Sequence, residues 1–237
     1  LSMEAGPASA LLPMPENHQI SLQNLKLYKK APAPWKLKGE GIMLIYRFSK
    51  KWMETNGDLP DHLKGNFKGG LGYLMLVNYT SSPVGPYKEL LFIPGKFSVY
   101  NKQSITKIYV STEVSTQNGR TNWGIPKQTL PFTWEKIDGN EQILLKDGDK
   151  TIFSCKIKSG GISFPVSTSF LPIDLHQLWD GVDFFTKPSG SGWGKIARVK
   201  DLSIDSDYFP DLTSKKPFVA VKFNPFHIGF PKATYAV

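Results

Sequence analysis

Apolar residues are grouped along this chain in short runs, and many of these runs predict β-strands. Residues 41–48 and 73–79 are almost wholly apolar, which is typical of strands covered on both faces. No run has the length and the 3.6-residue period of a long amphipathic helix, although residues 49–63 predict a short helix or a loop. Shorter or alternating runs predict further strands at residues 87–94, 107–111, 129–135, 142–146, 151–158, 195–204 and 218–223.

Glycine, proline and serine separate the predicted strands. Residues 81–86 and 147–149 predict turns, and the glycine-rich residues 189–194 predict a flexible turn. Many short strands at this spacing favour a β-rich α+β fold, a single-domain sandwich or antiparallel barrel with few short helices. We expect residues 1–19, rich in proline and alanine, to form an extended lead-in, and residues 20–237 to form the domain.

Composition and charge narrow the class of protein. The 237 residues carry a net charge of +9, but the cations are scattered and arginine is rare, so the charge favours solubility over nucleic-acid binding. The single cysteine, Cys155, excludes an intrachain disulfide, and its apolar neighbourhood predicts a small core residue. No apolar run predicts a membrane span, and the first residues do not resemble a signal peptide. We therefore expect a cytoplasmic protein without a membrane partner.

Catalytic motifs are scarce along the chain. The four histidines lack the spacing of metal ligands, so we expect neither a metal nor a cofactor. Residues 119–128 stand out because they hold two glycines and a proline directly before Lys127. We expect a compact turn here between two strands, with the stiff backbone at Pro126 holding Lys127 in a defined place. Partial desolvation would favour the neutral amine that a nucleophile needs; the alternative is a surface lysine beside a turn.

One carboxylate lies within an otherwise apolar predicted strand. Alternation places Glu89 on the same face as Tyr87 and Leu91. If that face is turned to the core, the carboxylate needs a cationic partner; if it is solvated, Glu89 is an ordinary exterior residue.

The segment around Lys127 resembles the central motif of the acetoacetate decarboxylase family, in which a strand leads to a glutamate, a Gly-Arg pair and an aromatic-x-Pro-Lys-Lys sequence. Here Glu113, Gly119, Arg120 and residues 123–127 match this pattern without a gap. Residues 85–90 resemble the family segment with an active-site glutamate, and residues 197–202 and 226–232 are fainter matches. The resemblance covers about residues 40–237.

This resemblance implies a cone-like antiparallel β barrel with the lysine inside a largely apolar cavity. The family's lysine attacks a ketone to form a Schiff base, and the iminium then acts as an electron sink for loss of carbon dioxide. By position, Lys127 corresponds to this lysine and Glu89 to a pocket carboxylate.

Three positions depart from the family pattern. Gln128 replaces the second lysine, Leu74 replaces another pocket glutamate, and Gly39, beside Lys38, replaces the pocket arginine. A substrate carboxylate would lack its usual clamp, so a carbonyl substrate other than acetoacetate is expected, and Gln128 is a candidate hydrogen-bond donor to it.

Two hypotheses about function follow. The first is an enzyme of specialised metabolism, with lyase, aldolase or dehydratase chemistry on an apolar keto compound through a Schiff base of Lys127, assisted by Glu89. The second is a non-covalent pocket protein, or a cyclase or isomerase, on the same barrel with a structural lysine. Either takes a small-molecule partner, and the sequence leaves a homo-oligomer open. The expected substrate-binding residues are Gln128, Arg120, Trp123, Tyr87 and Leu74.

Overall fold

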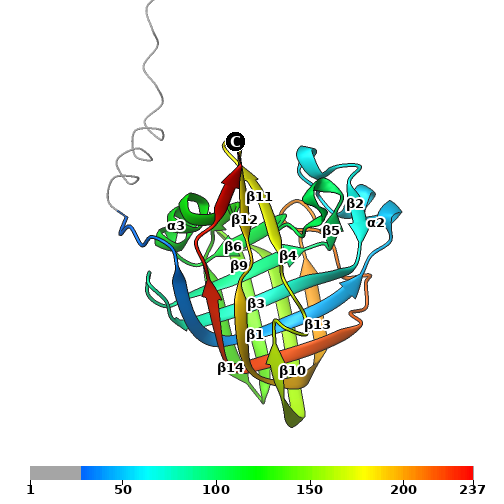
Figure 1. Cartoon of the computed structure of the whole chain (residues 1–237). Coiled ribbons are helices and arrows are strands. Elements are labelled where there is room, and N and C mark those ends of the chain that lie inside the picture. Colours follow the sequence, from blue (N-terminus) through cyan, green and yellow to red (C-terminus); the bar gives the residue numbers. More distant parts are fainter. Residues whose placement is uncertain (1–27, 237) are drawn as a thin grey trace, which may run out of the picture.

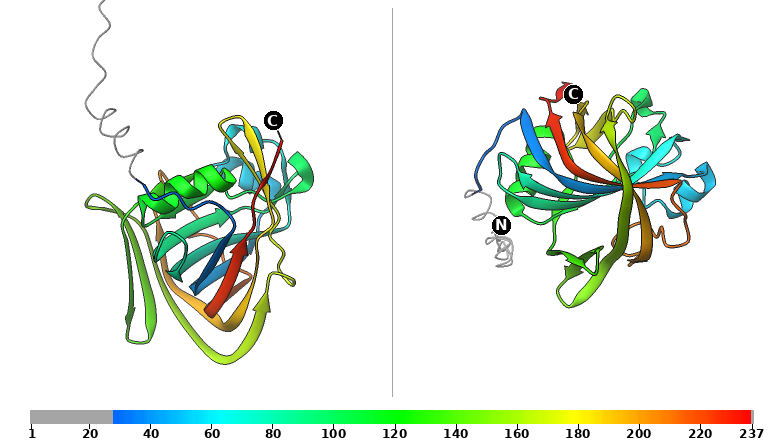
Figure 2. Two further views of the ribbon diagram at one scale, coloured as in Figure 1. Left: turned by 60° about the vertical axis from the view of Figure 1, so that its left-hand side comes forward. Right: turned by 90° about the horizontal axis from the view of Figure 1, so that it is seen from below.

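A strongly curled ten-stranded sheet forms the body of the protein in the computed structural model, which describes residues 28–236 (Figures 1 and 2). Its strands are β1 (Trp35–Arg47), β3 (Leu71–Ser81), β4 (Tyr87–Ile93), β6 (Lys107–Val110), β7 (Lys127–Thr129), β8 (Phe132–Ile137), β9 (Asn140–Asp147), β10 (Lys150–Ser167), β13 (Ser189–Ile204) and β14 (Val219–Phe230). The strand order is β7-β6-β4-β3-β1-β14-β13-β10-β9-β8, and every pair is antiparallel except β6 with β7. Because β7 and β8 end this order without pairing with each other in the described chain, the sheet is an open half-barrel.

Smaller elements cover parts of the sheet. β11 (Leu175–Trp179), β12 (Val182–Thr186) and β15 (Thr234–Ala236) form a three-stranded sheet, and β2 (Phe67–Gly69) pairs with β5 (Lys96–Phe97). The α-helices are α2 (Lys50–Asn56) and α3 (Glu113–Trp123), and Asp61–Leu63 and Val99–Asn101 form single 3₁₀ turns. No helix within residues 28–236 is long and apolar enough to cross a membrane. The prediction of a β-rich fold with few short helices is confirmed.

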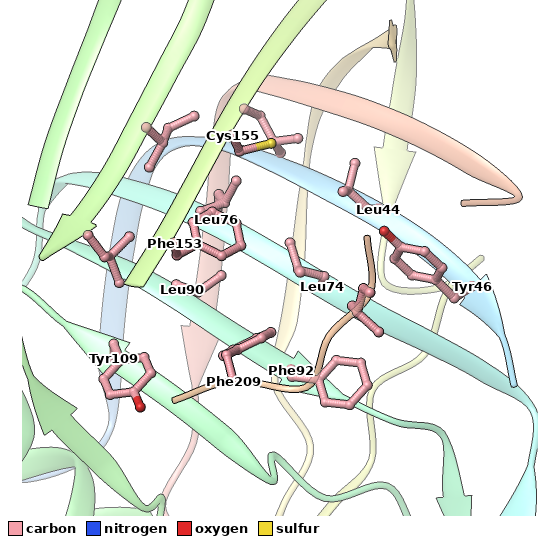
Figure 3. Close-up of a cluster of buried hydrophobic side chains, with 14 of the residues drawn as sticks. Leu44, Tyr46, Leu74, Leu76, Leu90, Phe92, Tyr109, Phe153, Cys155 and Phe209 are labelled. Atoms are coloured by element: carbon pink, nitrogen blue, oxygen red, sulfur yellow. The ribbon is translucent and has the colours of Figure 1, made fainter. Parts of the chain in front are cut away.

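Two hydrophobic cores lie on the two faces of the sheet. The first core includes Leu44, Tyr46, Leu74, Phe92 and Phe153 (Figure 3). Cys155 also belongs to it, and burial raises the pKa of this thiol to about 12, as expected for an inert core residue.

The second core includes Trp35, Met43, Tyr87, Val110 and Trp123. Successive side chains of a strand point to opposite faces, so β1 contributes alternate residues to both cores. This double burial explains why residues 41–46 of β1 are apolar without interruption.

Two predicted turns are wrong. The expected turn that begins at residue 119 belongs instead to α3, whose cap Thr112 accepts a hydrogen bond from the Ser115 amide and which ends at Gly124 with a φ of 62°. Serine, threonine, asparagine and glycine are weak helix formers, so packing rather than propensity stabilises α3.

Residues 189–194 are the beginning of β13 rather than a flexible turn. A Cβ at Gly190 or Gly192 would collide with backbone carbonyl oxygens of β14, so these glycines mark a close approach of two strands. The remaining predicted strands are present, except that residues 129–135 are divided between β7 and β8. The predicted lead-in at residues 1–19 and the first residues of the predicted domain lie outside the described residues.

Candidate active site

A small cavity lies within the second core. Its volume is about 50 Å³, and isoleucine, leucine, tryptophan, phenylalanine and tyrosine form most of its wall. Residues of β1, β3, β4, β6, α3, β7, β11 and β14 contribute to it. Among the described residues, only Lys127 and Glu89 contribute formal charges to the wall. A cavity with one cation and one carboxylate in an apolar wall strengthens every polar interaction inside it, because little water screens the charges.

Lys127 is the first residue of β7 and is held there by α3. Ile108 of β6 lies beside it in the parallel ladder, and the Nε atom of Arg120 donates a hydrogen bond to its backbone carbonyl at 2.9 Å. A Cβ at Gly119 would lie 2.6 Å from Cδ and 2.8 Å from Cε of the lysine. Glycine at this position therefore leaves the space through which the lysine side chain reaches the cavity.

Three groups surround the amine of Lys127. Its Nζ donates hydrogen bonds to Oε1 of Glu89 at 2.7 Å and to Oγ of Ser115 at 3.0 Å. The same nitrogen lies 5.0 Å from the ring centroid of Tyr87, within the range of a cation–π contact. The two side chains of the pair are only 4% and 6% exposed, so water provides almost none of their solvation.

Two tyrosines complete the polar part of the cavity. Burial, followed by the nearby charge of Glu89, raises the pKa of Tyr79 and of Tyr87 well above the ordinary value for a phenol. Both phenols therefore stay protonated near neutral pH and are available as hydrogen-bond donors. Their rings also contact each other, with centroids 4.9 Å apart.

The structure places four of the predicted site residues in the cavity wall: Lys127, Glu89, Tyr87 and Trp123. The indole Nε1 of Trp123 donates to the backbone carbonyl of Pro231 at 2.7 Å, which fixes the ring. Glu89 lies on a core-facing side of its strand with a cationic partner, the first of the two readings that the sequence allowed.

Three predicted substrate-binding residues lie elsewhere. Leu74 is in the first core, and its neighbour Met75 lines the cavity instead, because a single residue along a strand changes the face. Gln128 is exposed on the face opposite Lys127. The guanidinium of Arg120 binds the Lys127 backbone and lies 5.1 Å from the ring centroid of Trp179, outside the cavity wall.

Sequence reasoning missed Ser115 and Gly119, which support Lys127 from α3. A signal was present, since Thr112 and Gly124 are typical residues for the two ends of a helix. Recognising that helix would have placed Ser115 and Gly119, four residues apart, on one face beside the lysine. Within residues 28–236, no three side chains of histidine, cysteine, aspartate or glutamate gather as metal ligands.

Comparisons with known proteins identify the fold. No protein-family model and no curated protein sequence matches the chain. A solved structure of acetoacetate decarboxylase superposes with a TM-score of 0.65 at 13% sequence identity and covers 87% of this chain and 91% of its own. The acetoacetate decarboxylase from Legionella pneumophila gives a TM-score of 0.63 at 14% identity, with 89% and 90% covered.

The enduracididine biosynthesis enzyme MppR also shares the fold. Its complex with the condensation product of pyruvate and imidazole 4-carboxaldehyde gives a TM-score of 0.61 at 14% identity, with 98% and 97% covered. The half-barrel of this chain is thus an acetoacetate decarboxylase-like fold at low sequence identity, in agreement with the resemblance found in the sequence.

Proposed function

We propose that this protein is a Schiff-base enzyme in which Lys127 reacts with a small, uncharged carbonyl compound. The observation that carries the proposal is the position of the buried lysine amine, 2.7 Å from Glu89 in a largely apolar cavity. Buried lysines in such sites act as nucleophiles when their amine is neutral. The acetoacetate decarboxylase-like fold supports the same reading.

The pair of Lys127 and Glu89 provides a route to the neutral amine. Transfer of one proton from Nζ to Oε1 converts the ion pair into an amine and a carboxylic acid, and both are neutral in a site with little water. The amine then attacks the carbonyl carbon, and loss of water leaves a protonated imine. The positive nitrogen of this imine accepts the electrons of a bond that breaks at the carbon next to the imine carbon. Glu89 can take up or return the proton that moves in this step.

The charges in the cavity wall define the class of substrate. A carboxylate on the substrate would face Glu89, and the part of the wall that the structure describes offers no cation except the lysine that must become neutral. A ketone or aldehyde with apolar substituents avoids this repulsion and gains contact with residues such as Trp123 and Leu91. The volume of about 50 Å³ admits only a few water-sized groups, since one water needs roughly 10–15 Å³ by this measure.

One structural neighbour supports condensation chemistry as an option. MppR has been solved with the condensation product of two carbonyl compounds, so this fold accommodates reactions other than decarboxylation. For this chain, lyase, aldolase and dehydratase steps all begin from the same imine. The product formed from a trapped substrate would distinguish them.

The second candidate function is a non-covalent pocket protein, or a cyclase or isomerase, in which Lys127 is structural. The observation in its favour is that Glu89, Ser115 and the ring of Tyr87 already surround the amine. In that case Tyr79 and Tyr87 would hold an apolar ligand by hydrogen bonds and by shape.

Trapping with borohydride separates the two functions. We would incubate the folded protein with 2,4-pentanedione, acetone, pyruvate or acetoacetate, reduce the sample, and locate adducts by intact mass and peptide mapping. We expect an adduct on Lys127 with the uncharged compounds and little with the two acids. Lys222, the second buried lysine within residues 28–236, is an internal control and should remain unmodified.

Lys127→Ala should lose the adduct while remaining folded by circular dichroism. Failure of every carbonyl compound to modify the folded wild-type protein would contradict Schiff-base chemistry. Ligand extraction from the native protein would then be the next experiment.

A further inference from the structure

A second, larger depression lies on the opposite side of the strands that wall the cavity. In β1 and β14, Leu37 and Ile228 line both the cavity and an open groove of about 610 Å³, whereas their neighbours Lys36, Lys38 and His227 line the groove alone. The alternation of side chains along a strand accounts for this arrangement. Lys38 and His227 are direct partners in the pairing of β1 with β14, so their side chains lie on one face.

The groove has the composition of an anion-binding site. Two lysines and one histidine lie in its wall, together with six serine and threonine residues from β3, β10, β13 and the segment after β10. No aspartate or glutamate of the described chain, residues 28–236, lines it. Cations and hydroxyl donors without a competing carboxylate favour a negatively charged ligand.

The nearest carboxylate on the same strand is already paired. Glu40 follows Lys38 by two residues, and its Oε2 lies 2.9 Å from Nζ of Lys222. Its other carboxylate oxygen accepts a hydrogen bond from Asn78 at 3.1 Å. Glu40 therefore does not neutralise Lys36 and Lys38.

Part of the groove wall is also held in a fixed shape. The amide of Gly190 donates to Oγ1 of Thr168 at 3.0 Å, and the amide of Thr168 donates to the carbonyl of Gly190 at 3.0 Å. These reciprocal bonds tie the segment after β10 to β13. The hydroxyl-bearing residues on both sides, including Ser189 and Ser191, are thereby presented from ordered backbone.

From these observations we propose that the groove binds a small phosphorylated organic molecule, with its phosphate beside Lys36, Lys38 and His227. Compact ammonium groups bind phosphate as point charges, and the serine and threonine hydroxyls suit a polyhydroxylated remainder. The volume of the groove exceeds that of a phosphate group and falls in the range of small-molecule sites. The groove shares Leu37 and Ile228 with the wall of the Lys127 cavity but none of its charged residues, so its occupation does not depend on Schiff-base chemistry.

Titration by ¹⁵N NMR and calorimetry tests this proposal. The probes are ribose 5-phosphate, inorganic phosphate and ribose, all at one ionic strength because screening would otherwise change with each addition. We expect saturable binding of ribose 5-phosphate, weaker binding of inorganic phosphate and none of ribose. Amide shifts should centre on Gly190 and Ser191.

A pair of matched variants distinguishes a built site from general attraction to a basic protein. Lys36→Gln/Lys38→Gln removes two exposed cations from the groove and should weaken binding by about tenfold or more. Lys158→Gln/Lys200→Gln removes two exposed cations elsewhere, on β10 and β13, and should leave the affinity within about twofold.

Three outcomes would overturn the proposal. They are equal losses in the two double variants, shifts centred away from the groove, and no saturable binding by the wild-type protein. Equal affinity for inorganic phosphate and ribose 5-phosphate would overturn the organic part of the assignment. All four substituted lysines are exposed, so the variants should fold like the wild-type protein.

Discussion

Two buried lysines on opposite faces of the same sheet have different surroundings. Lys127 is paired with one carboxylate, that of Glu89, in the wall of the cavity. Lys222 lies between two carboxylates, with its Nζ 2.9 Å from Glu40 and 3.1 Å from Glu141. Its cross-strand partner Ile42 belongs to the first core, which places Lys222 on the face away from the cavity.

The comparison shows that burial and a carboxylate partner do not by themselves make a lysine a candidate nucleophile. Lys222 joins β14 to β1 and β9, and Trp134 adds an indole hydrogen bond to Glu141 and a ring 5.2 Å from the amine. Two carboxylates around one amine make Lys222 the centre of an ion-pair network that joins three strands. The amine of Lys127 has one carboxylate and one hydroxyl beside it, and the cavity leaves space for another molecule. A lysine that reacts with a carbonyl compound requires these features.

The largest expected effect tests the pair in the cavity. Lys127→Met should abolish trapping and lower the free energy of unfolding by about 3–5 kcal/mol, because Glu89 is left buried without its partner. Adding Glu89→Gln should recover part of that stability but none of the trapping. Urea denaturation and intact mass provide the two measurements. An unchanged unfolding midpoint in the single variant would show that the pair of Lys127 and Glu89 does not stabilise the fold as described.

A smaller loss of stability is expected when the buried lysine on the other face of the sheet is replaced. Lys222→Met should lower the free energy of unfolding by about 1–3 kcal/mol, since Glu40 is partly exposed and can be solvated. Trapping of carbonyl compounds on Lys127 should proceed at the wild-type rate. A reduced rate in a folded Lys222→Met protein would contradict the separation of the two lysines.

The support that α3 gives to Lys127 is tested by one methyl group. Gly119→Ala places a Cβ against the lysine side chain and should cost about 1–2 kcal/mol of stability after the better helix propensity of alanine is included. Trapping should slow by about tenfold, because displacement of the amine disturbs its approach to a carbonyl. Gly139→Ala, in a hairpin turn at a φ of 72°, serves as a control that affects stability only.

The smallest effect concerns pH. Burial raises the pKa of Glu40, but the hydrogen bond and charge of Lys222 outweigh it and hold the pKa below the ordinary value. The stabilisation is therefore present above the ordinary glutamate pKa and is lost as the pH falls through the lowered value. Glu40→Gln should remove this dependence of stability on acid pH. The expected change in the free energy of unfolding is under about 1 kcal/mol after solvent screening. Urea midpoints between pH 3 and pH 7 would detect it, and identical pH profiles for both proteins would refute it.

Local sequence patterns were sufficient for much of the fold. The apolar runs at residues 41–48 and 73–79 indicated strands covered on both faces, because side chains on both sides must then leave water. Lys127 and Glu89 could be singled out because a lysine after a proline and a carboxylate within an apolar strand are both unusual. That the two side chains meet across 38 residues of sequence depends on the pairing of β4, β6 and β7, which no local pattern encodes.

The sequence by itself thus determined the β-rich fold, the resemblance to acetoacetate decarboxylase and the two principal candidate residues. Only the tertiary structure decided which residues surround the pair: Met75 rather than Leu74 lines the cavity, and Ser115 rather than Gln128 contacts the lysine amine. The tertiary structure also shows that the expected turn at Gly119 is the end of a helix, although the residues of this helix have little intrinsic helix propensity. The physical reason is common to these cases: a side chain's face and a weak helix's stability are both set by the segments packed against them, which are distant in the chain.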